Sequence, residues 1–158
     1  MAIIAAMLSS LSATASPPIK PDNIDFAMTL TEARAHLANI CTSVSEREIK
    51  PAQIPGTRNK QMQLDCNGYV FHGKDRLAEF MFRDNELMLV WILTSAEEET
   101  TLEAWMESTN GTPTHKASEF TAFTNHQMAL RKTPHEVLYY SENAAPMFEA
   151  WFDSAAGH

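Results

Sequence analysis

The chain has 158 residues, of which 44% are hydrophobic and 20% are charged, a composition typical of one globular domain with its own core. Its formal net charge is −8, and the acidic residues are spread along the sequence. This charge balance excludes the dense positive patches that drive nucleic-acid binding and attraction to anionic lipid, and it favours a basic or neutral partner.

The first residues have the pattern of a secretory signal peptide. An apolar run from Ala2 to Leu11 is followed by Ala13 and Ala15, the small-x-small pattern that signal peptidase cleaves. No Lys or Arg precedes the apolar run, so the alternative is an ordinary buried N-terminal segment. The run is too short for a membrane span, and no later stretch approaches the necessary ~20 apolar residues. We predict an exported protein, periplasmic or secreted, with a signal peptide over 1–15 and a proline-rich tether over 16–28.

A helix is predicted from about residue 30 to residue 41. Thr29 and Glu32 have the spacing of a capping box, and apolar residues then recur at helical intervals. The following segment, 42–60, carries Pro51, Pro55 and Gly56 without a sustained period, so we predict an irregular connection there.

The chain has two cysteines, Cys41 and Cys66. In an exported protein an even pair is most simply a disulfide, which here would close a loop of about 25 residues and stabilise the fold by roughly 3 to 4 kcal/mol on the chain-entropy model. If the protein is not exported, both are expected to be buried free thiols.

From residue 61 to residue 94 the sequence predicts strands, over 62–71, 77–83 and 87–94. Asp84 and Asn85 form a suitable two-residue hairpin turn between the last two. The final strand is apolar on both faces, which places it in the middle of the sheet or under a helix.

The stretch LDCNGYVFHG, residues 64–73, gathers reactive residue types, but strand geometry separates them. On one continuous strand Cys66 and His72 stand about 20 Å apart at ~3.3 Å per residue, too far to act as a pair. A tight turn at Asn67 and Gly68 is the alternative, and it also keeps them apart. We favour the single strand, with Gly68 as a bulge or close-packing point.

A second helix follows from about 96 to 109. Ser95 and Glu98 have capping-box spacing, and Gly111 supplies the C-terminal cap. The acidic run from Glu97 to Glu99 suits the helix dipole, which favours a structural role over a cation site. Further strands are predicted over 119–124, 128–131 and 136–140, before a short amphipathic helix in APMFEAWF, residues 145–152.

The predicted fold is α+β, an antiparallel β-meander sheet packed by helices in the order α-βββ-α-βββ-α, within one domain over 29–158. The two halves, 29–94 and 95–158, could be tandem helix-plus-sheet units, although a single meander explains the same order. The order is similar to that of small exported proteins with tandem helix-plus-sheet units, such as the β-lactamase inhibitor proteins, and more loosely to short helix-plus-meander envelope proteins. The resemblance covers architecture alone, so no functional residue is carried over.

Catalytic and cofactor motifs are absent from the sequence, including nucleophile elbows, zinc-binding helices and phosphate-binding glycine loops. Histidines are the remaining candidates for a metal site; they are His36, His72, His115, His126 and His135. None are paired at ligand spacing, and solvated side chains explain them better. We predict no cofactor and no metal, and we favour a protein without catalytic activity.

Two functions fit the sequence. The first is an exported module that binds a protein or peptide through a sheet face or edge; its candidate contact residues on the terminal helix are Met147, Phe148, Trp151 and Phe152. The second is a small-ligand binder or enzyme with an apolar cavity between helix and curved sheet, as in cystatin-like and nuclear-transport-factor-like folds. The candidate lining residues of that cavity are Tyr69, His72, Trp91 and Trp105.

Overall fold

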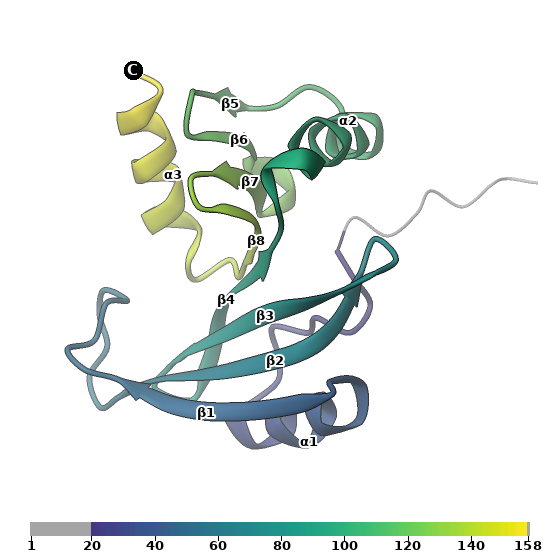
Figure 1. Cartoon of the computed structure of the whole chain (residues 1–158). Helices are drawn as coiled ribbons and strands as arrows, with labels where there is room; N and C mark the ends of the chain where they lie inside the picture. Colours follow the sequence, from purple (N-terminus) through teal and green to yellow (C-terminus); the bar gives the residue numbers. More distant parts are fainter. Residues whose placement is uncertain (1–19, 158) are drawn as a thin grey trace, which may run out of the picture.

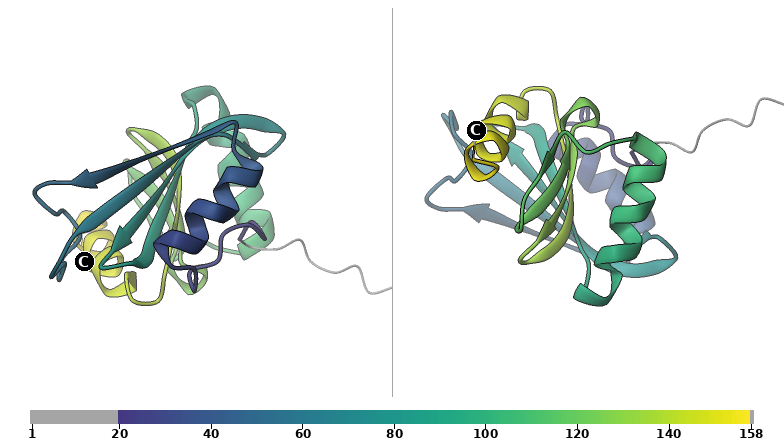
Figure 2. Two further views of the ribbon diagram at one scale, coloured as in Figure 1. Left: turned by 90° about the horizontal axis from the view of Figure 1, so that it is seen from below. Right: turned by 90° about the horizontal axis from the view of Figure 1, so that it is seen from above.

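The computed structural model describes residues 20–157, in which three helices pack on one eight-stranded antiparallel sheet (Figure 1). The strand order is β1-β2-β3-β4-β8-β7-β6-β5. Helices α1 and α2 lie on one face of the sheet and α3 lies on the other (Figure 2). The predicted α+β class and antiparallel meander are confirmed. The predicted signal peptide, 1–15, and the beginning of the predicted tether lie outside the described residues.

The helices are α1 (Leu30–Ile40), α2 (Glu99–Asn110) and α3 (Ala145–Ala155), with short 3₁₀ turns η1 (Ala96–Glu98) and η2 (Thr124–His126). The strands are β1 (Ser43–Ile49), β2 (Gln61–Phe71), β3 (Lys74–Arg83), β4 (Glu86–Leu93), β5 (His115–Lys116), β6 (Phe120–Phe123), β7 (Met128–Lys132) and β8 (His135–Tyr140).

The first helix begins at the capping box that the sequence predicts. The Glu32 N–H donates to Thr29 Oγ1 at 3.3 Å, and the Thr29 N–H donates to Glu32 Oε2 at 2.8 Å. Two of the unpaired donors of the first turn are satisfied in this way. The buried side of α1 consists of Leu30, Ala33 and Leu37.

Part of the expected irregular connection, 42–60, is a strand. β1 pairs with β2 from Ser43 opposite Asn67 to Ile49 opposite Gln61. The sequence did not predict β1 because it lies at the edge of the sheet, where most of its side chains are exposed and give no apolar alternation. The two-residue β5, at the opposite edge, was also not predicted. Each half of the chain therefore contributes four strands rather than three.

The rest of that connection, 51–60, is irregular, as predicted, and its backbone is held by two side chains. Gln61 Oε1 accepts the N–H groups of Gln53 and Ile54 at 2.7 and 2.8 Å. The Asp84 carboxylate accepts three further N–H groups, from residues 58, 59 and 60. These hydrogen bonds lower the pKa of Asp84 and leave Ile54 buried against the sheet, on the same side as α3.

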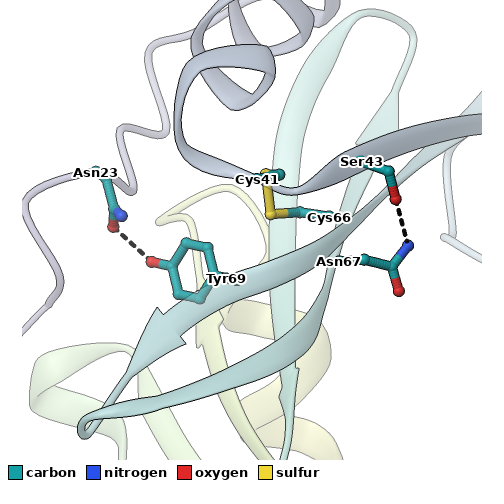
Figure 3. Close-up of a disulfide and its surroundings, with 6 residues drawn as sticks. All are labelled: Asn23, Cys41, Ser43, Cys66, Asn67 and Tyr69. Atoms are coloured by element: carbon teal, nitrogen blue, oxygen red, sulfur yellow. Dashed lines mark hydrogen bonds between the residues drawn. A yellow bond between two sulfur atoms is a disulfide. The ribbon is translucent and has the colours of Figure 1, made fainter.

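Cys41, directly after α1, forms a disulfide with Cys66 on β2, as predicted (Figure 3). The single strand predicted through residues 64–71 is also confirmed, and it carries a bulge at Gly68. Gly68 has φ +75°, and a Cβ there would lie 2.2 Å from Thr42 Oγ1. The extra residue resets the strand's alternation, so Cys66 and Tyr69 are both buried in the core beneath α1 and α2.

Both β-hairpin turns of the first half use residues with positive φ. Asp84 and Asn85 have φ 49° and 76°, which confirms the predicted hairpin turn between β3 and β4. His72 and Gly73, with φ 50° and 69°, form the corresponding turn between β2 and β3. Such turns have a backbone twist that matches the twist of the strands they join.

The second predicted capping box does not form. The Ser95 side chain makes no cap hydrogen bond to the helix backbone, and η1 separates it from α2. The Glu98 carboxylate instead accepts two hydrogen bonds from the guanidinium of Arg76, at 2.7 and 2.9 Å, and pairs with Lys74 at 2.8 Å. These hydrogen bonds hold the pKa of Glu98 well below its usual range. Tertiary ion pairing has replaced local capping.

The described end of the predicted tether packs on the core. Ile24 is 1% exposed, and Asn23 Oδ1 accepts a hydrogen bond of 2.5 Å from the Tyr69 hydroxyl (Figure 3). Phe26 and Met28 are partly buried and pack against the same core. Residues 22–28 therefore belong to the folded domain rather than to a tether.

The two halves of the chain meet at the centre of the sheet. Each consists of a helix followed by four consecutive antiparallel strands, and the last strand of each half, β4 and β8, pairs antiparallel from Leu89 opposite Tyr140 to Leu93 opposite Glu136. Apolar side chains fill both sides of the sheet, in one core beneath α1 and α2 and a second beneath α3. We call these the α1–α2 face and the α3 face.

Candidate functional site

The α3 face is covered by a helix over the second half of the sheet. Phe148 and Phe152 are 6% and 0% exposed, and their rings lie 4.8 Å from Tyr140 and 4.7 Å from Phe120. These two predicted contact residues therefore pack on their own sheet. The other two, Met147 and Trp151, are half-buried at the margin of α3.

The same face is hollowed over the first half. The hollow measures about 450 Å³ and lies between the 51–60 connection and α3. Its polar lining residues are Arg47, Gln53, Gln63, Glu79 and Arg131; its apolar lining residues are Ile49, Ile54, Met81, Leu89, Trp91, Met147 and Phe148. We refer to it as the open hollow. It joins a charged wall to an apolar one, which is the composition of a recognition site rather than of a core.

The charged wall comes from strands in register. Asp65 on β2 stands directly opposite Glu79 on β3, and Glu79 stands opposite Trp91 on β4, so the three side chains share the α3 face. Gln63, 2% exposed, donates from Nε2 to Asp65 Oδ1 at 2.6 Å. Arg47 on the edge strand lies 3.5 Å from Asp65 and 3.8 Å from Glu79.

Burial raises the pKa of Glu79, and the neighbouring Asp65 carboxylate adds to the increase. Arg47 and the Gln63 amide act in the opposite direction without cancelling it. The ionised form of Glu79 is therefore less stable here than in water. Two cations act on this pair of carboxylates: Arg47, whose side chain is 55% exposed, and Arg131, whose charge also favours the ionised form of Glu79.

Arg131 closes the hollow on the side of the second half. Its guanidinium carbon lies 4.3 Å from the centroid of the Trp91 ring, and its Nη2 pairs with the buried carboxylate of Glu136. Burial lowers the pKa of Arg131. Trp91 thus already holds one guanidinium on its face, a cation–π contact that is stronger when partly desolvated.

The four residues predicted to line one cavity lie on two faces of the sheet: Trp91 is separated from the other three. Tyr69 is fully buried in the core of the α1–α2 face, and burial raises the pKa of its hydroxyl. His72 lies in the turn between β2 and β3, where its ring packs 4.2 Å from that of Trp105 on α2. Trp91 alone lies in the open hollow, on the opposite face. The sequence does not place Trp91 on one face, because β4 is apolar on both faces.

The histidines occupy separate places. His115 pairs with Asp153 at 2.8 Å, and His135 lies 3.3 Å from Glu99, whereas His72 packs on Trp105. Across residues 20–157 no three His, Cys, Asp or Glu side chains are grouped so that they could hold a metal ion. The acidic run from Glu97 to Glu99 has structural partners, since Glu98 binds Arg76 and Glu99 pairs with Lys132.

The sequence reasoning missed most polar residues of the open hollow, namely Arg47, Gln63, Glu79 and Arg131, and the neighbouring Asp65. One local signal was present. Gln61, Gln63 and Asp65 alternate with apolar residues on a strand that is central to its half of the sheet, and polar residues at such positions indicate a face that is not a plain core. The contributions of Arg47 and Arg131 depend on the order of strands, which no local pattern encodes.

Within the described range, no helix is both long and apolar enough to cross a membrane. No protein-family model, curated protein or solved structure matches the chain.

Proposed function

We propose that the protein is an exported, non-catalytic module that binds another protein or a peptide through the open hollow. The observation that carries this proposal is the unequal covering of the α3 face: its own helix packs over the second half, while the hollow over the first half has a tryptophan, two methionines and partly exposed charges. Aromatic residues, methionine and arginine are enriched in the centres of protein interfaces.

Export is supported by the disulfide between Cys41 and Cys66, because such bonds persist in oxidising compartments. It is also supported by the sequence pattern of residues 1–15. A periplasmic or secreted location would bring the hollow into contact with envelope or extracellular proteins.

A binding role rather than catalysis is supported by the partners of the charged groups. Asp65 and Glu79 are held by Gln63 and Arg47, and no serine, cysteine or histidine belongs to the residues that line the hollow. Nucleophilic catalysis requires such a group with a base in reach.

Site-specific photo-crosslinking tests the proposal. A photo-reactive amino acid at Arg47 points into the hollow, whereas the same amino acid at the adjacent Glu46 points to the α1–α2 face, where Glu46 pairs with Arg34. We expect a discrete protein adduct from position 47 and none from position 46 in envelope or secreted extracts. Adducts from both positions would indicate binding at the β1 edge, and adducts from neither would contradict a protein partner.

A small-ligand role is the second candidate, because about 450 Å³ falls within the size range of ligand pockets, roughly 300 to 1,000 Å³. The hollow, rather than a cavity between helix and sheet, would then be the site. A low-molecular-weight compound that co-purifies with the chain and quenches Trp91 fluorescence, together with no protein adduct at position 47, would favour this role.

A further inference from the structure

We propose that a second hollow, between residues 20–26, η2 and the link from β8 to α3, binds an uncharged, hydroxyl-rich ligand of the saccharide class. We refer to it as the polar hollow. It measures about 540 Å³, more than the open hollow, and this volume lies within the size range of ligand pockets, roughly 300 to 1,000 Å³. Among residues 20–157, none lines both hollows, so this inference does not depend on the proposed protein-binding function.

Polar side chains from three parts of the chain meet at this hollow. Its polar lining includes Asn125, His126 and Gln127 from η2 and its cap, Glu142 and Asn143 from the link before α3, and Glu86 from the start of β4. The open hollow, in contrast, has a largely apolar lining. The ligand of the polar hollow is therefore expected to be bound by hydrogen bonds rather than by apolar contact.

Four of the lining side chains have no internal partner. Among residues 20–157, the side chains of Asn125, His126, Gln127 and Glu142 take part in no hydrogen bond or ion pair. The backbone beneath them is held in place, since the Tyr140 N–H donates to the Gln127 carbonyl at 3.0 Å. Gln127 has φ 46°, a left-handed conformation that is uncommon outside glycine and is concentrated at functional sites. The hollow thus presents unused polar groups from a fixed backbone.

The charges around the hollow favour an uncharged ligand. Glu86 already accepts a hydrogen bond from the Asn143 amide and pairs with Arg83 at 3.4 Å. The other two lining charges, Lys20 and Glu142, have opposite signs. An anion or a cation would therefore meet one attractive and one repulsive group, whereas a neutral ligand meets no repulsion.

The unused groups differ in what they donate and accept. The amides of Asn125 and Gln127 do both, the Glu142 carboxylate only accepts, and the Lys20 ammonium only donates. A hydroxyl group donates, accepts and rotates to suit its partner, so a molecule with several hydroxyls satisfies all of these groups.

A peptide main chain matches this lining less well, because its N–H only donates and its carbonyl only accepts. Stacking on an aromatic ring is not available either, since the Lys20 ammonium lies over the Phe26 ring, 5.0 Å from its centroid. Hydrogen bonding to hydroxyl groups is therefore the recognition that the polar hollow supports.

An NMR titration of the full oxidised chain with disaccharides tests the inference. The probes are maltose, cellobiose and N,N′-diacetylchitobiose, each at up to about 20 mM, a concentration that detects even millimolar affinity. We expect saturable shifts at the backbone amides of His126, Gln127 and Glu142 with at least one disaccharide, and no shift at the Trp91 indole in the open hollow. The absence of saturable shifts with all three probes, or shifts confined to Trp91 and its neighbours, would overturn the inference.

Charged probes test the argument from charge. Succinate and putrescine, at the same concentration as the disaccharides, should cause no saturable shift at Gln127 or Glu142. Saturable binding of either probe, without binding of a disaccharide, would show that the polar hollow selects a charged ligand.

Variants test whether the named side chains bind the disaccharide. Gln127→Gly removes the amide but suits the backbone, because glycine adopts positive φ without strain, and it should weaken binding about fivefold. Glu142→Ala, at an exposed position, should weaken binding about tenfold, because a charged acceptor is lost. The control Glu119→Ala makes the same charge change at an exposed position outside the hollow and should leave affinity within about twofold. Equal losses in Glu142→Ala and Glu119→Ala, or unchanged binding in both variants of the hollow, would overturn the inference.

Discussion

The two four-stranded halves of the sheet share one order of elements and differ in what covers their α3 face. On β6 and β7 this face presents Phe120, Ala122 and Ala129, and the aromatic side of α3 packs on it. On β2 and β3 the corresponding face presents Gln63, Asp65, Glu79 and Met81, and a hollow remains. The composition of each half decides whether its face is buried within the chain.

This difference has an energetic basis. A helix that covers Phe120 removes apolar surface from water, at roughly 25 cal/mol per Å². A helix that covered Asp65 and Glu79 would have to desolvate two carboxylates, which costs several kcal/mol per ion unless matched cations and donors are supplied. The terminal helix supplies no such cation, because it has no basic residue in its last turn.

The largest effect is expected where α3 covers the second half. Phe152→Ala removes a fully buried ring from the contact with Phe120 and should lower the free energy of unfolding by about 3 to 5 kcal/mol. Urea denaturation followed by circular dichroism measures the change. Glu149→Ala, on an exposed position of the same helix, should change stability by less than about 0.5 kcal/mol. An equal, small effect of both substitutions would show that α3 is not part of the stable core.

The disulfide joins two elements of the first half, the end of α1 and β2. Replacement of Cys41 and Cys66 by alanine opens a link with a sequence separation of 25 residues, and on the chain-entropy model the expected loss is about 3 to 4 kcal/mol. Urea denaturation of the double variant, with and without a reductant, measures it. The reductant should lower the stability of the unsubstituted chain to a similar extent and leave the variant unchanged. Insensitivity of the unsubstituted chain would mean that the thiols are not linked in solution.

Two glycines of the first half distinguish a close approach from a simple turn. At Gly68, φ is +75° and a Cβ would lie 2.2 Å from Thr42 Oγ1, so Gly68→Ala should cost about 2 to 3 kcal/mol. At Gly73, φ is +69° but no atom lies within 4 Å of the added Cβ. Gly73→Ala should therefore cost about 1 kcal/mol, from backbone strain alone. Thermal unfolding of the two variants compares them directly, and equal costs would remove the role assigned to the bulge.

Local patterns were sufficient to predict much of this fold. The capping box at Thr29 and the turn at Asp84 depend on neighbouring residues, and both formed as expected. The disulfide followed from having one even pair of cysteines. β1 was missed because an edge strand has little apolar surface to bury, and the second capping box failed because distant Arg76 claimed Glu98.

The open hollow depends on the register and the order of the strands, which local sequence patterns do not encode. The alternation of polar residues in 61–65 indicates one wall of the hollow. The register of β2 with β3 places Asp65 opposite Glu79, and the sequence pattern does not predict this register. The contact of Arg131 with Trp91 requires β8 to lie between β4 and β7. The bulge at Gly68 adds a further obstacle, since it changes which residues of β2 face each side after that point.

The smallest expected effect is that of replacing Glu79, and it tests whether this carboxylate of the hollow stabilises the fold. Because the pKa of Glu79 is raised in the folded chain, its ionised form opposes folding at neutral pH, and protonation relieves this as the pH falls through the raised pKa. Glu79→Gln should therefore increase the free energy of unfolding at pH 7 by up to about 1 kcal/mol, and the gain should vanish below about pH 4. Urea denaturation at both pH values measures this change, with Glu48→Gln on the exposed edge strand as the control that should show no gain.

Loss of stability at pH 7 would mean that the Glu79 carboxylate stabilises the fold. A gain would mean that the chain keeps an unfavourable carboxylate at a part of this face that its own helix leaves open, as expected if the carboxylate serves a partner.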